Sequence, residues 1–266
     1  FALLTNIHLH ARSQDLVSDK PISTSRRTVS RVALQGIIES LYIAVKRLQW
    51  RQGNTEWSDY YSDAKHTYAT QATSHKKLIV QKYLEMISPK SVWDLGANDG
   101  TYSRLATDQG IPTIAFDSDP TAVEKNYLDS VSREDTKMLP LLLDLTNPSA
   151  DIGWSNEERM SLLSRTPTDM VMALALMHHL VISNNVPFVR LAEWLSMISR
   201  TLIIEFVPKN DPQVLRLLSY RKDIFADYTR TSFEREFDKW FVTIKVSKIN
   251  HSNRLVYLMQ NRSNLR

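Results

Sequence analysis

The residues with the clearest chemical meaning are two glycines four positions apart, Gly96 and Gly100. Glycine is scarce in this chain, with 6 in 266 residues, and these two follow an apolar run that ends in Asp94. The pattern is typical of a strand, a tight turn and the start of a helix, because glycine adopts positive φ angles and lets the backbone approach a ligand closely. It therefore predicts a cofactor site at the turn.

Aspartates end three successive apolar runs, at Asp94, Asp117 and Asp144. Asp117 follows Gly96 by about 20 residues, the spacing at which one strand–helix unit brings a carboxylate to a ribose. A single aspartate at a strand end is explained equally well as a turn or a helix cap, and Asp119 fits a cap better. Three aspartates at the same edge of a parallel sheet favour a cofactor site instead.

The turn also limits the class of cofactor. A nicotinamide site has the pattern Gly-x-Gly-x-x-Gly and rests a pyrophosphate on the helix N-terminus, where Asp99 would place a negative charge. A P-loop requires Gly-Lys-Ser/Thr, which this turn lacks. A cofactor that has no phosphate and ends in a free amino acid suits an acidic turn better.

Two adjacent histidines, His178 and His179, follow the fourth apolar run. An imidazole at a strand end can remove a proton from an attacking hydroxyl or amine. It can equally pack against the next helix and bond a backbone carbonyl. The sequence gives no basis for preferring one histidine, although adjacent side chains point in different directions. We expect no metal site here, because no further ligand follows at i+3 or i+4.

Short apolar runs alternate with amphipathic stretches from residue 91 onward, which is the pattern of an α/β doubly wound parallel sheet. The predicted strands are 91–95, 112–117, 139–144, 169–176 and 201–206, and the predicted helices are 100–109, 119–131, 155–165 and 185–199. Runs 141–143 and 171–176 are apolar throughout, as strands covered by helices on both faces must be.

The two ends of the chain differ from this alternation. After a helix at 231–239, strands 240–249 and 254–260 form a hairpin that adds an antiparallel strand. Helical spacing at 30–50 and 74–88 precedes the sheet. We divide the chain into an N-terminal helical and linker segment, 1–73, and a sheet domain, 74–266. The chain begins at Phe1, so we expect the first segment to be the remainder of a longer region.

Composition limits the class of protein. A hydrophobic content of 42% and a charged content of 23% are typical of a soluble globular protein. No stretch approaches the roughly 18 to 20 apolar residues of a membrane span, and residues 1–30 lack a signal-peptide pattern. We therefore expect a cytoplasmic protein without membrane contacts. The absence of cysteine excludes disulfides, thiolate metal sites and a cysteine nucleophile.

The net charge of +4 is concentrated in residues 1–55. A basic segment of this kind indicates either a solvated helical face, which we favour, or a docking surface for nucleic acid. A nucleic-acid enzyme usually carries basic residues around its active face as well.

The order Asp94-x-Gly96-x-x-x-Gly100, Asp117, Asp144 resembles the class I S-adenosylmethionine-dependent methyltransferases, from about residue 76 to the C-terminus. The resemblance implies a seven-stranded Rossmann-like sheet whose seventh strand is antiparallel. It also implies S-adenosylmethionine as the methyl donor and S-adenosylhomocysteine as the product.

Site roles follow from the same resemblance. Asp94, Gly96 and Gly100 would surround the methionine end of the cofactor, and Asp117, with Ser118 beside it, would take the ribose hydroxyls. Asp144 and Leu145 would meet the adenine edge. The family's middle glycine is Asn98 here, which we count as a cofactor residue because asparagine adopts left-handed conformations more readily than most residues.

Three further segments, 141–149, 175–187 and 204–209, are similar to a group of bacterial methyltransferases, some of them labelled nodulation-related. Those proteins are longer, with an N-terminal region that is largely absent here. Because the acceptors of that group are not established, the narrower resemblance adds little about substrate.

Acceptor contacts are predicted at Asn184 and Glu205. The alternative for Asn184 is that it caps the following helix, which we favour. The alternative for Glu205 is that it forms a structural ion pair. The tripeptide 147–149 is similar to the Asn-Pro-Pro-Tyr motif of amino-methyltransferases. It follows the third strand, whereas that motif belongs after the fourth, so we reject base methylation.

The sequence thus predicts methyl transfer to an oxygen or nitrogen of a small-molecule acceptor, with His178 or His179 as the candidate base. One alternative is an RNA or protein methyltransferase that docks through the basic N-terminal segment. Another is a cofactor-binding scaffold without turnover. The oligomeric state is left open.

Overall fold

The computed structural model describes residues 30–48 and 70–265, together with positions 8, 9, 12, 50 and 53. The chain divides into two units, Phe1–Gly53 and Asn54–Arg266, and each is described by itself. The boundary at residue 74 stays a prediction, because residues 54–69 lie outside the described ranges. None of the described helices is long and apolar enough to cross a membrane.

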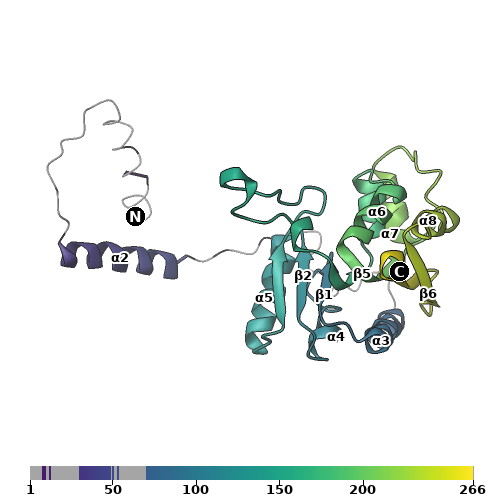
Figure 1. Ribbon diagram of the computed structural model, residues 1–266, viewed down its shortest axis with the longest axis horizontal. Coiled ribbons are helices and arrows are strands. Elements are labelled where there is room, and N and C mark those ends of the chain that lie inside the picture. The colour runs from purple at the N-terminus through teal and green to yellow at the C-terminus, as the bar shows by residue number, and fades with distance from the viewer. Residues whose placement is uncertain are drawn as a thin grey trace. The chain divides into compact units, whose positions relative to one another are not determined.

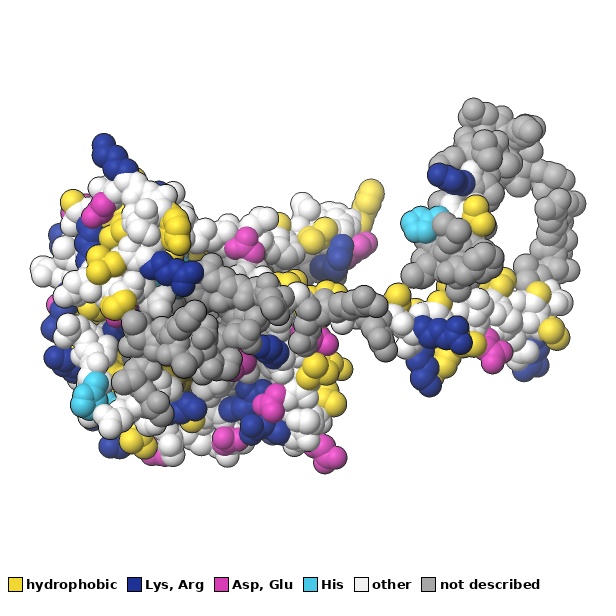
Figure 2. Space-filling view, turned by 180° about the vertical axis from the view of Figure 1, so that it is seen from behind, with side chains coloured by type: hydrophobic (Ala, Val, Ile, Leu, Met, Phe, Trp, Pro, Cys, Tyr) yellow, Lys and Arg dark blue, Asp and Glu magenta, His cyan; other side chains and the backbone are white. Residues whose placement is uncertain are grey.

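The first unit contains helix α2 (Arg31–Lys46). The helix begins where the Ser30 hydroxyl accepts the Ala33 N–H at 3.2 Å, an N-cap that satisfies one of the free donors of the first turn. No residue of α2 is buried, and Figure 2 shows apolar and basic side chains exposed along it. The helix expected at 30–50 is confirmed, whereas much of the basic segment 1–55 lies outside the described residues.

The second unit is a seven-stranded sheet with helices packed against it (Figure 1). Its strands are β1 (Val92–Leu95), β2 (Thr113–Asp117), β3 (Met138–Leu142), β4 (Thr168–Ala173), β5 (Ser199–Phe206), β6 (Phe241–Lys248) and β7 (Leu255–Asn261). Its helices are α3 (Thr70–Ile87), α4 (Arg104–Thr107), α5 (Pro120–Ser132), α6 (Phe188–Ile198), α7 (Pro212–Ser219) and α8 (Arg230–Phe237). The described part also contains a π-helical turn, η4 (His179–Ser183), and 3-10 turns at Trp154–Asn156, Leu163–Arg165 and Arg262–Leu265.

The strand order is β3-β2-β1-β4-β5-β7-β6. The first five strands in this order pair in parallel, and β7 inserts antiparallel between β5 and β6. The α/β sheet with an antiparallel terminal strand is therefore confirmed. Because β1 lies at the centre and the chain moves outward on both sides of it, the carboxyl ends of β1, β2 and β4 meet at one edge, where such folds bind ligands.

Burial of both sheet faces explains why the central strands are continuously apolar. In β4, Met170 and Met172 belong to the core cluster beneath α3 and α4. Val171 and Ala173 belong to the opposite cluster, beneath α6 and α8. Successive side chains of a strand point to opposite faces, so a strand covered on both sides needs an apolar residue at every position.

Strand β3 does not follow this rule, although its leucine run predicted burial on both faces. Leu139, Leu141 and Leu142 are all exposed, Leu142 by 60%. The reason is topological: β3 is an edge strand that pairs only with β2, and edge positions are less fully covered than central ones. The prediction of burial is wrong for this run.

The helix predicted at 155–165 is also absent. The segment instead contains the two short 3-10 turns at Trp154–Asn156 and Leu163–Arg165. Positive φ angles at Gly153, Ser155 and Asn156 interrupt any regular helix. The Asp151 carboxylate accepts hydrogen bonds from the Ser161 N–H and the Ser164 hydroxyl, which ties the segment into a loop.

Two elements around the sheet edge differ from the sequence expectation. The helix expected at 100–109 is regular only over α4, and α7 was not predicted at all. Asp211 caps α7 by accepting the Gln213 N–H at 3.0 Å, and Pro212 occupies its first position. This Asp-Pro pair is a standard helix-start signal that the sequence does carry.

Two glycines with nearly equal positive φ angles, Gly100 and Gly110, allow a matched test of packing at the turn. A Cβ at Gly100 (φ +79°) would overlap the Asn126 side chain, whereas at Gly110 (φ +77°) nothing lies within 4 Å. Gly110→Ala should lower the free energy of unfolding by about 1–2 kcal/mol, the cost of a left-handed conformation. Gly100→Ala should lower it by at least about 1 kcal/mol more, because overpacking adds strain. Urea denaturation measures both, and equal losses would contradict the close packing.

Candidate functional site

The turn after β1 has the conformation that its sequence predicts. Gly96 and Gly100 have φ angles of +72° and +79°, and Asn98 adopts φ +51°, so asparagine does take a left-handed conformation here. The Gly96 N–H donates to the Phe116 carbonyl at 2.9 Å. The Asn98 N–H donates to the Asp117 carboxylate at 2.7 Å. Both bonds fasten the turn to the end of β2.

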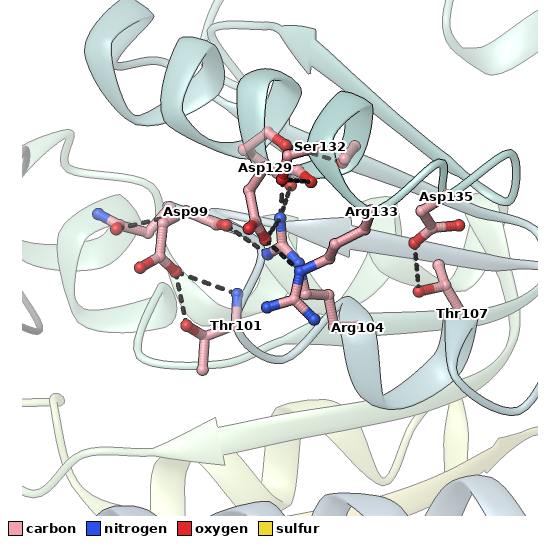
Figure 3. Close-up of polar contacts among 11 residues, drawn as sticks. Asp99, Thr101, Arg104, Thr107, Asp129, Ser132, Arg133 and Asp135 are labelled. Atoms are coloured by element: carbon pink, nitrogen blue, oxygen red, sulfur yellow. Dashed lines mark hydrogen bonds and ion pairs between the residues drawn. The ribbon is translucent and has the colours of Figure 1, made fainter.

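A charged network fastens the far side of the turn to α5 (Figure 3). Arg104 donates to the Asp99 carbonyl at 2.6 Å and pairs with Asp129 at 2.7 Å. Arg133 pairs with the same Asp129 oxygen at 2.8 Å. The Asp99 carboxylate accepts from the N–H of Thr101 at 3.0 Å and from its hydroxyl at 2.7 Å. Asp99 is thus a turn-forming residue.

A cavity of about 410 Å³ opens beside this turn, a volume within the usual range of small-molecule sites. It is lined by Gly96, Asn98, Phe116, Asp117, Ser118, Leu143, Asp144, Leu145, Thr146, Leu174, Ala175, Leu176, His179, Leu180, Ser183, Asn184, Arg216, Leu217 and Tyr220. Asp99 does not line it, so the charge that we expected to repel phosphates is not there and that argument is wrong. The acidic groups that do line the cavity are Asp117 and Asp144.

Six of the eight predicted cofactor residues line the cavity: Gly96, Asn98, Asp117, Ser118, Asp144 and Leu145. They come from the turn after β1 and from the ends of β2 and β3, so the sheet gathers residues that are far apart in the sequence. The remaining two, Asp94 and Gly100, are buried next to the turn and do not line the cavity. Both residues support the turn in this structure, and their contact with the cofactor stays a prediction.

The three aspartates lie in different environments. Burial raises the pKa of Asp94 from 3.8 to about 7, although the Ser103 hydroxyl donates to its carboxylate at 2.6 Å. Burial also raises the pKa of Asp117, opposed by the N–H groups of Asp119 and Asn98, at 2.8 and 2.7 Å. Asp144 is largely exposed, and hydrogen bonds from Thr146 lower its pKa.

The structure distinguishes the two histidines. His179 lines the cavity, and burial, with Arg254 nearby, lowers its pKa to about 4. His178 is only 1% exposed and does not line the cavity. Burial, followed by the neighbouring His179, lowers its pKa well below the usual value. Because the rings are 4.2 Å apart between centroids, His178 packs behind His179, which leaves His179 as the candidate base.

The two residues predicted to contact the acceptor, Asn184 and Glu205, lie in different environments. Asn184 lines the cavity and donates to the His179 carbonyl at 3.1 Å. It therefore closes the π-helical turn η4, and the N-cap of α6 is Pro187. Its predicted role in capping the following helix is wrong, whereas its contact with an acceptor stays a prediction.

Glu205 is 0% exposed and lies outside the cavity lining. Its carboxylate pairs with Lys76 at 2.5 Å and with Arg254 at 3.4 Å, and it accepts the Ala175 N–H at 2.9 Å. Burial would raise the pKa of Glu205, but the two cations outweigh burial and lower it, so the group stays ionised. The predicted role in binding an acceptor is wrong, and the structural ion pair is what the structure contains.

Sequence reasoning missed one wall of the cavity. Arg216, Leu217 and Tyr220 come from α7 and the residue that ends it. The apolar wall at Leu176 and Leu180 was not identified either. In the described part of the chain, no cluster of three or more His, Asp or Glu side chains could hold a metal ion.

Comparisons with known proteins agree with this architecture. The chain is 34% identical over 236 residues to "Nodulation protein NoeA" of Rhizobium meliloti (strain 1021). The match covers 88% of this chain and 49% of the relative, so the chain spans about half the length of that protein. The similarity to nodulation-related bacterial proteins is confirmed. No family model matches the chain.

Two solved structures share the fold. A putative O-methyltransferase from Nostoc punctiforme PCC 73102 aligns with a TM-score of 0.54 at 14% identity, over 77% of this chain and 60% of the other. Magnesium protoporphyrin IX methyltransferase (ChlM) from Synechocystis PCC 6803, solved with bound SAH, aligns with a TM-score of 0.51 at 15% identity, over 77% and 92%. The chain has the class I methyltransferase fold. The cavity lies at the carboxyl ends of the parallel strands, where open α/β sheets bind ligands.

Asp94 should give the unit that contains the sheet a characteristic pH dependence. Its pKa is raised from 3.8 to about 7 in the fold, so the native state holds more protons than the unfolded chain between these values. Stability contributed by protonated Asp94 is therefore present below pH 3.8 and lost as the pH rises to about 7. Relative to Asp94→Asn, the wild type should lose up to about 1.4 kcal/mol per pH unit across this window. Urea denaturation at each pH measures the difference, and a difference independent of pH would contradict the burial of an ionisable Asp94.

His179 should remain neutral well below the pH at which exposed histidines gain a proton. With its pKa lowered to about 4, the ring should show no titration between about pH 5 and 8, where an ordinary histidine titrates. NMR of protein carrying ¹⁵N-labelled histidine measures this directly, with His179→Gln to assign the resonance. A His179 midpoint near 6.5 would contradict the buried environment.

Proposed function

We propose that this chain binds S-adenosylmethionine in the cavity and transfers its methyl group to an oxygen or nitrogen of a small-molecule acceptor. The observation that carries the proposal is the convergence of three strand ends on one cavity. The glycine turn, Asp117 and Asp144 come from β1, β2 and β3, and all three contribute to its lining. The solved structure of ChlM with bound SAH supports the choice of cofactor.

The chemistry of the donor set fits this cofactor. Asp117 accepts backbone N–H groups from Asn98, Asp119 and Ser118, and because a carboxylate has about four acceptor positions, it can still accept a hydroxyl of a ribose. Gly96 leaves space that a side chain would fill, since its Cβ would lie 3.0 Å from Leu176 Cδ1. Leu143 and Leu145 give the β3 side of the cavity an apolar surface for an adenine ring.

The chain's own groups would position and deprotonate the acceptor. When bound, S-adenosylmethionine supplies an electrophilic methyl group on a sulfonium, which leaves as S-adenosylhomocysteine when the carbon–sulfur bond breaks and the carbon–oxygen or carbon–nitrogen bond forms. His179 is the cavity-lining imidazole, and its lowered pKa keeps it unprotonated near neutral pH. A neutral imidazole can accept the acceptor's proton, although so low a pKa makes it a weak base, and most of the acceleration would come from positioning.

A small molecule is favoured as the acceptor for two reasons. The cavity is of small-molecule size, and η4 and α7 contribute to its lining. The face of the methyltransferase unit in Figure 2 shows basic and acidic side chains interspersed. A continuous basic surface would instead favour nucleic acid.

Asp117 is the most direct test of cofactor binding. Asp117→Asn keeps the side chain's size but removes the charge that would hold the ribose hydroxyls. Hydrogen bonds to a charged group contribute about 1.5–3 kcal/mol, so the affinity for S-adenosylhomocysteine should fall by roughly 10- to 100-fold. Isothermal titration calorimetry measures the dissociation constants.

The matched control is Asp238→Asn at the exposed C-cap of α8, outside the cavity lining. It should leave the affinity unchanged. If the wild type does not bind S-adenosylhomocysteine, or if both variants bind it as the wild type does, the proposal is wrong.

A further inference from the structure

We propose that the acceptor carries an anionic group beside an apolar body, and that Arg216 contacts this group. The inference rests on the proposed function, because it assigns the part of the cavity that the cofactor would leave open. It names a substrate class and a residue that the sequence did not identify.

The charges around the cavity are separated in space. Both acids of the lining, Asp117 and Asp144, belong to the β2 and β3 side. Arg216, on α7, is the single arginine or lysine among the lining residues. His179 adds no positive charge near neutral pH. A ligand that spans the cavity therefore meets acids at the cofactor end and a cation at the α7 end.

The surroundings of Arg216 fit an anion attached to an apolar body. Leu176, Leu180 and Leu217 line the same cavity as Arg216. Tyr220 lies one helical turn beyond Arg216, so the two side chains share a helix face, and the ring is 79% exposed. The guanidinium has five N–H donors in a planar fork that matches a carboxylate or phosphate, so contacts within the protein can coexist with a ligand.

The first turn of α7 is fixed by a buried ion pair. Arg254, 3% exposed, donates to both oxygens of the Asp211 carboxylate, at 2.7 and 2.9 Å. Asp211 is the N-cap of α7. Arg254 also reaches Glu205 at 3.4 Å, and Glu205 holds the Ala175 N–H at the cavity wall. One buried network thus orients α7 and the end of β4 together.

The end of α7 is fastened as well. Arg221 donates to the Ile182 carbonyl in η4 and to the Asn185 side chain, the latter at 2.7 Å. Arg216 is therefore presented from a helix anchored at both ends. A preorganised cation of this kind avoids much of the ordering cost of binding, and the arrangement favours recognition of a ligand over a loosely placed surface charge.

The test uses the full chain saturated with S-adenosylhomocysteine and matched aromatic probes. 4-Hydroxybenzoate and phenyl phosphate carry the anion, and 4-hydroxybenzamide is the neutral partner. The wild type should bind at least one anion about tenfold more tightly than the amide, as measured by ligand-observed NMR titration. Whether the carboxylate or the phosphate binds more tightly distinguishes the two kinds of anionic group.

Arg216→Gln should remove the preference for the anion, and Arg216→Lys should retain part of it because the charge remains. Arg190→Gln, an exposed arginine on α6 paired with Glu193 outside the cavity, should behave as the wild type. Every variant should bind S-adenosylhomocysteine with unchanged affinity.

Two results separate this inference from the proposed function. Failure of the wild type to bind S-adenosylhomocysteine contradicts the proposed function. Binding of S-adenosylhomocysteine with no preference for either anion, or with a preference that survives in Arg216→Gln, contradicts only the role assigned to Arg216.

Discussion

Glu205 carries a negative charge inside the unit that contains the sheet, with none of its surface exposed, and such a charge is stable only when cations and hydrogen-bond donors surround it. Lys76 from α3 and Arg254 from the start of β7 provide the cations. The Ala175 N–H completes the set. Because Arg254 also fixes the cap of α7, satisfying one buried charge places two walls of the cavity.

The cavity combines this rigid frame with a separation of charge. Its acids lie at the ends of β2 and β3, where the turn after β1 supplies backbone donors. Its arginine belongs to a second wall, on α7. Burial keeps His179, in the same lining, neutral. A molecule with a cationic centre and hydroxyls suits the first wall, and an acceptor with an anionic group suits the second, so the charge pattern orients both ligands.

Much of the fold was predictable because it depends on local patterns. Apolar runs at the right spacing located all seven strands of the sheet. The glycine turn and Asp117 were predicted to form a site, and both contribute to the lining of the cavity. The failures also have physical causes. Residues 155–165 do not form the predicted helix, because left-handed residues and side-chain hydrogen bonds hold the segment in a loop. The leucine run of β3 is exposed because its strand is at the edge.

The sequence by itself determined where the strands lie along the chain, the turn at Gly96 and the aspartates at the strand ends, because periodicity and turn chemistry act between near neighbours. Only the tertiary structure decided which side chains face the cavity. It placed His179 in the lining and His178 behind it, and it paired Glu205 with Lys76 and Arg254 in the interior. The physical reason is that a side chain's exposure and charge partners depend on segments far apart in the chain, which no local pattern records.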